Sequence, residues 1–211
     1  VSLAKSGTAA NTDFDLTTEL SIASGQTTAT AALDPTDDTI FEADETVIID
    51  ISAVSGGGAT ENGTQQETVT ITNDDSAPTV TLASSASSIA ENAGSSLTLT
   101  ATLSNPTNAA VTVTLSTSGT ATAGADYASL SNITIAAGDT TGTTSFTPTD
   151  DNTFEGDERA IIDISGVSGG SAGESGTQQV TITVSEDDAG PTLSINDVTT
   201  SDESAANATF T

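Results

Sequence analysis

The chain repeats its own sequence at a spacing of 113 residues, and this repeat limits the possible architectures more than any other feature. Residues 34–52 and 147–165 are identical at thirteen of nineteen aligned positions. The same spacing aligns residues 62–66 with residues 175–179. Duplication over this length indicates structural units joined in tandem.

The repeat predicts one whole unit between two partial ones. We place the first unit at residues 1–75, the second at 76–188 and the start of a third at 189–211. The first unit begins at a position that matches Val113, so it has no residues corresponding to the first strands of the second unit.

The second unit is predicted to consist of strands. Its apolar and β-branched residues mostly alternate with polar ones, which is typical of strands, and no stretch shows helical periodicity with caps. The expected strands are Thr79–Leu82, Ser96–Leu103, Ala110–Thr117, Ile133–Ile135, Thr141–Phe146, Arg159–Ile164 and Gln178–Ser185. Seven short strands at this spacing favour an all-β fold of tandem immunoglobulin-like β-sandwich repeats.

The charge of the chain excludes several classes of partner. Thirty acidic residues face only Lys5 and Arg159, for a net charge of −28. Nothing basic is available to bind the phosphates of nucleic acid or an anionic membrane surface. No apolar run is long enough to insert into a membrane. So high a charge destabilises a compact state unless cations offset it, although a generally acidic, salt-adapted surface is the alternative.

The acids of the second unit gather at strand ends and turns. They are Glu91, Asp126, Asp150, Asp151, Glu155, Glu158, Glu186, Asp187 and Asp188. Strand ends of a sandwich meet at two poles, so these carboxylates are expected to converge, at a cost that a bound cation would remove. Ca²⁺ takes six to eight oxygen ligands, whereas a chain without His or Cys suits Zn²⁺ and Cu²⁺ poorly.

Four motifs of the second unit together resemble a known family. They are Ile89–Asn92, Gly119–Ala121 followed by Asp126 and Tyr127, the stretch 150–158 (DDNTFEGDE), and Glu186–Asp188. This set is similar to the Calx-beta domain, which occurs in sodium–calcium exchangers, integrin β4 and large bacterial surface proteins. The resemblance covers the second unit, most of the first and the opening of the third.

The resemblance implies a calcium site in each unit. In the second unit it implies that the nine acids named above bind Ca²⁺ together with the carbonyl of Thr153. In the first unit the corresponding positions are Asp13, Asp37, Asp38, Glu42, Glu45, Asp74 and Asp75, with the carbonyl of Ile40. The third shows only Glu203. Asn73 replaces an acid in the first unit, which also has no match for Glu91, so a weaker site or fewer ions are expected there.

Other interpretations of these residues are less well supported. An acidic pole without bound ions remains the alternative to a calcium site. A glycosidase would pair two carboxylates but usually adds aromatic platforms, and the chain has one Tyr and no Trp. Without His, nucleophilic catalysis lacks its usual base, so we predict no enzyme. Thr-x-Thr runs suit ordinary exposed strand faces better than ice binding. Tyr127 and Phe154 are expected to be core anchors.

We therefore predict a calcium-binding structural repeat module of an extracellular, cell-surface protein, as an adhesin stalk or a fibre subunit. Calcium would rigidify the junctions between repeats. The alternative is a regulatory calcium sensor of the exchanger type, and repetition argues against a third possibility, a ligand-binding adhesin tip.

The expected partners are neighbouring repeats or identical chains. Residues 189–211 match about 77–99, which is most of what the first unit lacks. The tail of one molecule could therefore complete the first unit of the next by strand donation, with Glu203 as the added carboxylate. Such head-to-tail contacts would propagate a filament. The alternative is a fragment cut from a longer array.

Overall fold

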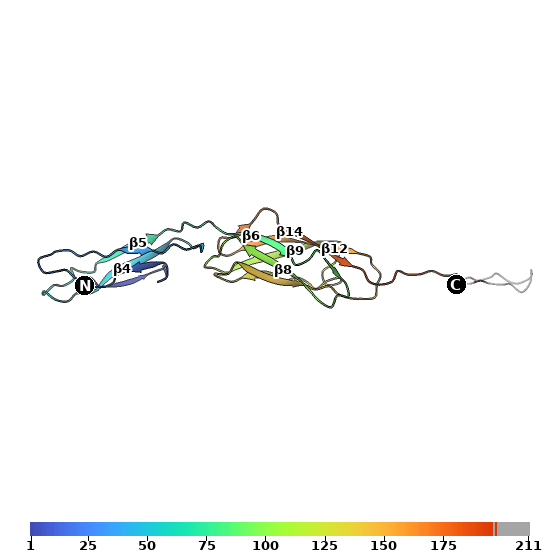
Figure 1. Cartoon of the computed structure of the whole chain (residues 1–211), viewed down its shortest axis with the longest axis horizontal. Coiled ribbons are helices and arrows are strands. Elements are labelled where there is room, and N and C mark those ends of the chain that lie inside the picture. Colours follow the sequence, from blue (N-terminus) through green and yellow to red (C-terminus); the bar gives the residue numbers. More distant parts are fainter. Residues whose placement is uncertain (196, 198–211) are drawn as a thin grey trace, which may run out of the picture.

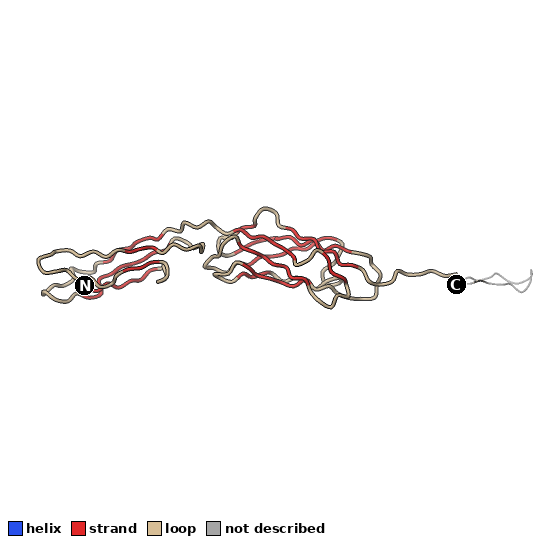
Figure 2. Tube along the Cα trace, in the orientation of Figure 1, coloured by secondary structure: helices blue, strands red, loops and turns tan. Residues whose placement is uncertain are grey.

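Two elongated units lie end to end in the computed structural model, which describes residues 1–195 and 197 (Figure 1). We call residues 1–75 repeat 1 and residues 76–188 repeat 2. The described residues form strands and loops without a helix (Figure 2). Accordingly, this part of the chain offers no helix of the length and apolarity that crossing a membrane requires.

Repeat 2 is a sandwich of two sheets. Its strands are β6 (Thr79–Ser84), β7 (Ser88–Ala90), β8 (Leu97–Leu103), β9 (Val111–Gly119), β10 (Ile133–Ile135), β11 (Thr141–Phe146), β12 (Glu158–Ser168), β13 (Gly173–Glu174) and β14 (Gln179–Ser185). One sheet has the order β10-β9-β12-β14-β7 and the other β11-β8-β6-β13. All seven expected strands are present. The short edge strands β7 and β13, which pair in parallel with β14 and β6, were not predicted.

Alternating side chains from both sheets fill the core of repeat 2. Val111 and Val113 of β9 and Ile162 of β12 are fully buried. The neighbouring positions along each strand are more exposed, so the burial alternates with a period of two. The Tyr127 and Phe146 rings stack with centroids 4.7 Å apart. Tyr127 is thus the core anchor that its position predicts.

The prediction for Phe154 is wrong. Its side chain is 51% exposed, because the residue lies in the loop between β11 and β12 rather than on a strand facing the other sheet. Phe154 therefore lies outside the core, at the acidic end of repeat 2.

Repeat 1 contains only part of this sandwich. Its strands are β1 (Ser2–Gly7), β2 (Phe14–Leu16), β3 (Leu33–Pro35), β4 (Glu45–Ala53) and β5 (Gln66–Ile71). The sheet β1-β4-β5 corresponds to β9-β12-β14, and β2 pairs with β3. Its buried apolar side chains are Phe14, Leu16 and Val47. Ile49 is only partly buried, whereas its counterpart Ile162 is fully buried, because the described residues place no second sheet across β4 comparable to that of repeat 2.

A glycine explains why both repeats carry the Gly-Thr-Ala motif. Gly7 and Gly119 have φ angles of 121° and 110°, and a Cβ on either would lie 2.1 Å from the carbonyl oxygen of Thr46 or Arg159. Only glycine permits this approach. The same Arg159 carbonyl accepts hydrogen bonds from two following backbone N–H groups at 2.9 and 3.0 Å. The motif therefore holds the chain against β4 or β12.

The two repeats join through Phe41 of repeat 1 and the Asn105–Asn108 loop of repeat 2. The Phe41 N–H donates to the Pro106 carbonyl at 2.9 Å, and the Asn108 N–H donates to the Phe41 carbonyl at 3.3 Å. Phe41 thus forms a parallel bridge with Thr107. The junction is a backbone contact and not only a covalent linker.

The expected fold class, all-β with tandem sandwich repeats, is confirmed. The unit boundaries and the strand donation from residues 189–211 stay predictions. Glu203 lies outside the residues that the structure describes.

Candidate metal centres

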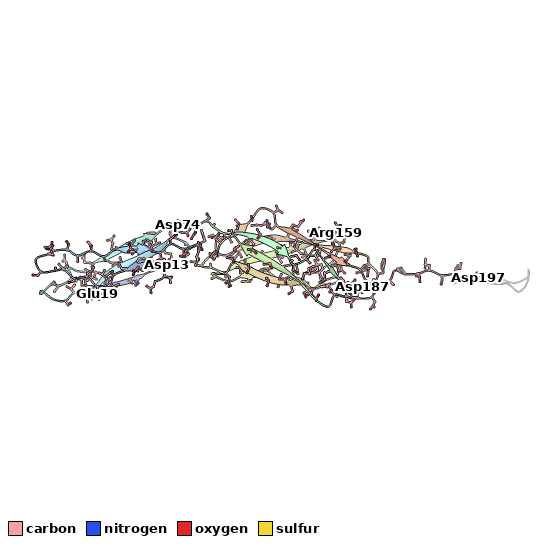
Figure 3. The ribbon with its side chains drawn as sticks, viewed as in Figure 1. Asp13, Glu19, Asp74, Arg159, Asp187 and Asp197 are labelled. Atoms are coloured by element: carbon pink, nitrogen blue, oxygen red, sulfur yellow. The ribbon has the colours of Figure 1, made fainter. Side chains whose placement is uncertain are left out.

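Each repeat carries an acidic cluster at the same end. Asp13 and Asp74 lie at the end of repeat 1 that faces repeat 2, and Asp187 lies at the far end of repeat 2 (Figure 3). We call the clusters site 1 and site 2. Both combine the loop before β4 or β12 with the run after β5 or β14, because β4–β5 and β12–β14 are antiparallel pairs whose ends meet at this pole.

Site 2 gains Glu91 through the parallel pairing of β7 with β14. Ala90 lies opposite Ser185, and the Glu91 N–H donates to the Ser185 carbonyl at 3.0 Å. This places the buried Glu91 side chain beside Glu186, 95 residues later in the sequence. The Asp151 N–H donates to Glu91 at 3.2 Å, so Glu91 also supports the loop before β12.

The carboxylates of site 2 form overlapping groups. Three sets each have oxygen atoms within 4.8 Å of one another: Asp126, Glu155 and Glu158; Glu91, Asp151 and Glu155; and Glu91, Glu186 and Asp187. Adjacent sets share Glu155 or Glu91, so seven of the nine predicted acids form one connected cluster. Cations bridging such a cluster would neutralise several charges at once.

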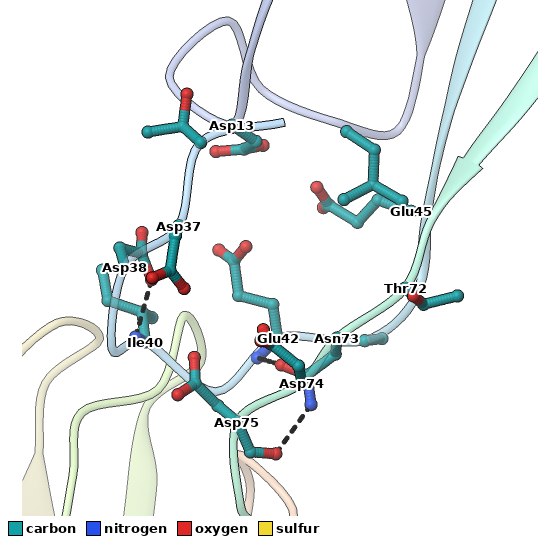
Figure 4. Close-up of a pocket in the computed structure, with 13 residues that line it drawn as sticks. Asp13, Asp37, Asp38, Ile40, Glu42, Glu45, Thr72, Asn73, Asp74 and Asp75 are labelled. Atoms are coloured by element: carbon teal, nitrogen blue, oxygen red, sulfur yellow. Dashed lines mark hydrogen bonds between the residues drawn. The ribbon is translucent and has the colours of Figure 1, made fainter. Parts of the chain in front are cut away.

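Site 1 reproduces the first of these sets. Oxygens of Asp13, Glu42 and Glu45 lie within 4.8 Å of one another, and these residues are the counterparts of Asp126, Glu155 and Glu158. The Asp13, Asp37, Glu42 and Glu45 side chains extend into one space (Figure 4).

The space in site 1 is a cavity of about 50 Å³. All eight residues predicted for this site line it: Asp13, Asp37, Asp38, Ile40, Glu42, Glu45, Asp74 and Asp75. A single water needs about 10–15 Å³ on the same measure, so the cavity has room for a partly hydrated ion.

The backbone before β4 and β12 is held in the same turn in both repeats. Asp38 accepts a hydrogen bond from the Ile40 N–H at 2.7 Å, and Asp151 accepts one from the Thr153 N–H at 2.6 Å. A carboxylate that bonds the backbone two residues on stabilises a turn. The turn is therefore shaped by the predicted ligands themselves.

Glu186 organises the loops of site 2. Its carboxylate accepts hydrogen bonds from the N–H groups of Glu155 at 2.5 Å, Gly156 at 2.7 Å and Asp188 at 2.8 Å. These bonds lower the Glu186 pKa to about 2, so the group stays ionised. In site 1, Asn73 stands at this position, and its Oδ1 accepts from the Glu42 N–H at 3.2 Å. The sequence analysis treated Asn73 only as the loss of an acid. The structure shows that Asn73 keeps part of the role of Glu186, because it still accepts a bond from the loop before β4.

Two further carboxylates escaped the sequence analysis. Asp157 accepts a hydrogen bond from the Glu186 N–H at 3.0 Å, and Asp44 accepts one from the Asn73 N–H at 3.0 Å. These bonds tie the closing run to the loop before β12 or β4. The signal was available, because both acids recur at the repeat spacing within the most similar stretch.

Crowding of the carboxylates raises several pKa values. Burial raises the pKa of Glu158 to about 7, helped by a hydrogen bond shared with Asp126 and by the nearby charges. Burial and neighbouring acids also raise the pKa of Glu91 and Glu155 in site 2, and of Glu45 in site 1. Ionised carboxylates therefore repel one another at this pole, which a cation would relieve.

The outer acids surround these compact groups. Burial raises the Asp188 pKa, as do the charges of Asp187, Glu186, Asp151 and Asp150. Asp188 Oδ2 is buried and has no hydrogen-bond partner among the described residues. The tight groups of three do not include Asp150, Asp188, Asp37, Asp38, Asp74 or Asp75.

The donor set fits Ca²⁺. It consists of carboxylate oxygens, with the Thr153 and Ile40 carbonyls in the same turns, and the unpartnered Asp188 oxygen is a free ligand atom. Calcium accepts many oxygens in flexible geometry, whereas Mg²⁺ keeps its waters and uses one or two carboxylates. The coordination roles of the individual residues stay predictions.

Comparison with known proteins adds two findings. The sequence matches the Calx-beta domain family over residues 3–75 and 73–188. The fold is similar to the crystal structure of the apo-form Calx CBD1 domain, with a TM-score of 0.43 and 21% sequence identity over 52% of this chain and 99% of that chain. No curated protein showed significant similarity to the chain.

Proposed function

This chain belongs to the Calx-beta domain family, and we propose that it is a calcium-binding structural module of an extracellular surface protein. The family resemblance predicted from the motifs is thereby confirmed. Domains of this family typically bind calcium, and its repeats are non-catalytic modules. The proposal for this chain rests on its own acidic sites.

The observation that carries the proposal is the repeated carboxylate triad. Asp13, Glu42 and Glu45 form the same compact group as their counterparts in repeat 2, although the surrounding cores differ. A solvated acidic surface would favour separation of its charges, not the same close group twice. Calcium at each site would join the loop before β4 or β12 to the run after β5 or β14.

Calcium at site 1 would also stiffen the junction. Phe41 lies between the predicted ligands Asp38 and Glu42, and its backbone bonds to the Asn105–Asn108 loop of repeat 2. Burial and then the charges of nearby acids raise the pKa of Glu42, and Asn108 on the adjoining loop partly offsets this rise. The loop before β4 therefore carries ligands of site 1 and also contacts repeat 2. A calcium ion that orders this loop would order the contact between the repeats as well.

This role suits an extended stalk or fibre outside the cell. Bound cations would reduce the self-repulsion that comes with a net charge of −28. Extracellular calcium-binding modules bind the ion weakly, up to the millimolar range. The end-to-end arrangement of the repeats suits a spacer, whose partners are neighbouring repeats (Figure 1). We propose a cell-surface location on this basis.

Calorimetric titration of the full chain with Ca²⁺ tests the site assignment. Glu155→Ala and Asp187→Ala remove predicted ligands, so each should weaken binding at site 2 by at least about 10-fold, as even supporting residues of metal sites do. Asp139→Ala and Asp163→Ala are matched controls, because neither acid belongs to the clusters. Equal losses in all four variants would mean a diffuse acidic surface.

Small-angle scattering with increasing calcium separates a spacer from a sensor. A spacer should bind in the millimolar range and show a narrower distribution of chain dimensions when loaded. A large change of shape at micromolar calcium would instead support a regulatory sensor and contradict the structural role.

A further inference from the structure

The contact of Phe41 shows how one repeat docks on the next. The Asn105–Asn108 loop presents the Pro106 carbonyl and the Asn108 N–H to the two sides of the Phe41 backbone. The same loop binds the linker, since the Asn105 side chain donates to the Ser76 carbonyl at 3.0 Å. The loop is neutral and rich in amide groups, so it can lie against an acidic cluster without adding to its repulsion.

Phe154 is the counterpart of Phe41 at the free end of repeat 2. It lies between the predicted ligands Thr153 and Glu155, and its ring is 51% exposed. Within the described part of the chain, the Phe154 N–H has no hydrogen-bond acceptor. The linker after β14 passes this ring, because a Cβ on Gly190 would lie 3.8 Å from it. The site thus repeats the docking half of the junction without the loop that covers it.

The residues after this linker match the first core strand of repeat 2. Leu193 and Ile195 align with Val80 and Leu82 of β6, which are 0% and 7% exposed. Leu193 and Ile195 are 101% and 74% exposed. Together with Phe154 they place three large apolar side chains at one end of repeat 2, where a following repeat would bury them.

We propose that Phe154 and its loop are a docking surface for a Calx-beta domain joined in tandem after Pro191. The occupant is the loop of that domain that corresponds to Asn105–Asn108, which pairs with the Phe154 backbone as Asn105–Asn108 pairs with the Phe41 backbone. The docked loop then lies next to site 2, as the Asn105–Asn108 loop lies next to site 1 through its contact with Phe41. The proposal goes beyond calcium binding, because the backbone pairing does not require the ion.

Hydrogen exchange on a three-repeat chain tests this surface. Residues 79–188, which contain the complete core of repeat 2, are added again directly after Pro191 in place of the present tail. The added copy then follows Pro191 as Thr79 follows Pro78. Exchange of the Phe154 amide should slow at least about 10-fold relative to the two-repeat chain, because a hydrogen-bonded amide exchanges only on opening.

A matched variant shows whether the proposed loop is responsible. Asn108→Pro in the added copy removes the N–H that donates to the carbonyl of the docking phenylalanine, and proline has no replacement donor. The Phe154 N–H itself bonds the counterpart of the Pro106 carbonyl, so losing one of the two bonds of the junction should weaken docking and speed exchange at Phe154 while Phe41, within the same molecule, stays protected. Calcium titration of the same chains reports the ion sites separately, so failure of docking and failure of calcium binding are distinguishable.

Three results would overturn the proposal. The first is fast exchange at Phe154 in the three-repeat chain while the core amides of the added copy and the Phe41 amide are protected. The second is failure of the added copy to fold, since its core is that of repeat 2. The third is protection of Phe154 in the two-repeat chain that grows with concentration, which would make a second copy the occupant.

Discussion

Repeat 1 and repeat 2 have nearly the same acidic site on very different cores. Repeat 2 buries eighteen apolar residues between two sheets, whereas repeat 1 buries three on a three-stranded sheet with a two-stranded ribbon. The triad of Asp13, Glu42 and Glu45 nevertheless has the geometry of its counterpart. The triad therefore depends on the loops around the three-stranded sheet that both repeats share, and not on the complete sandwich.

The difference also shows what strand β7 supplies to site 2. Site 2 has Glu91, which β7 brings to the pole by pairing with β14, and no residue of repeat 1 corresponds to it. Conversely, the loop of site 1 contacts the Asn105–Asn108 loop of the neighbouring repeat through Phe41, and the loop of site 2 has no such neighbour among the described residues. Each site is thus complete on a different side.

Removing calcium should have the largest effect on this comparison. An ion bound only to the native state stabilises it by about 4 kcal/mol at 1,000 times the dissociation constant. A chelator should therefore lower the melting temperature strongly, and more for repeat 2, which has the larger ligand set. Calorimetric melts with and without chelator, with Mg²⁺ as the control, measure this. An unchanged melt would mean that calcium contributes nothing.

The next largest effect should come from substituting matched apolar residues, which should cost repeat 2 more stability than repeat 1. Ile162→Ala leaves a cavity in a fully buried position and should cost about 3 kcal/mol. Ile49→Ala, at the corresponding and partly exposed position, should cost about 1 kcal/mol. Urea unfolding followed by hydrogen exchange in each repeat gives both values. Equal costs would show that Ile49 is covered in solution, as strand donation predicts.

Replacing Asn73 by Glu and Glu186 by Asn should change the calcium affinities of the two sites in opposite directions. Asn73→Glu adds a carboxylate where Glu186 accepts three or more backbone hydrogen bonds, so calcium affinity at site 1 should rise several-fold. Glu186→Asn removes a charge and should weaken site 2 by about 10-fold, or about 1.4 kcal/mol. Calorimetric titration of both variants tests this. Parallel changes in the two variants would contradict the assigned equivalence.

The smallest effect should be on the pH dependence of the calcium-free protein. The Glu158 pKa, about 7 in the folded state against 4.5, means that the native protein binds more protons than the unfolded chain between these values. Stability without calcium should therefore fall as pH rises from 4.5 to 7. With calcium the trend should reverse, because protons compete with the ion.

Melting temperatures at pH 5.5 and 7.5, with chelator and with calcium, measure both trends. Glu158→Gln cannot titrate and should flatten the calcium-free curve. Glu186 stays ionised across this range, since its pKa is about 2, and does not contribute. If the melting temperature of Glu158→Gln without calcium changes with pH as much as that of the unchanged protein, a group other than Glu158 binds the proton.

Much of the architecture was readable from the sequence because repetition and alternation are local signals. The period-2 pattern of residues 141–146 and 178–185 predicts strands without knowledge of their partners. The three-residue strand β7 and the two-residue strand β13 have no such pattern, since they exist only through pairing with β14 and β6. Phe154 was misplaced for a related reason, because an aromatic residue in a loop looks the same in sequence whether it is buried or exposed.

The sequence by itself determined which residues form the acidic loops and that these loops recur in the same order. Composition and spacing are sufficient for that, since like carboxylates at strand ends must converge wherever a sandwich forms. Only the tertiary structure decided which carboxylates meet and what covers them. The parallel pairing that places Glu91 beside Glu186 and the bridge that places Phe41 against Thr107 join residues 95 and 66 positions apart. Contacts over such separations depend on strand register and repeat packing, which no local pattern encodes.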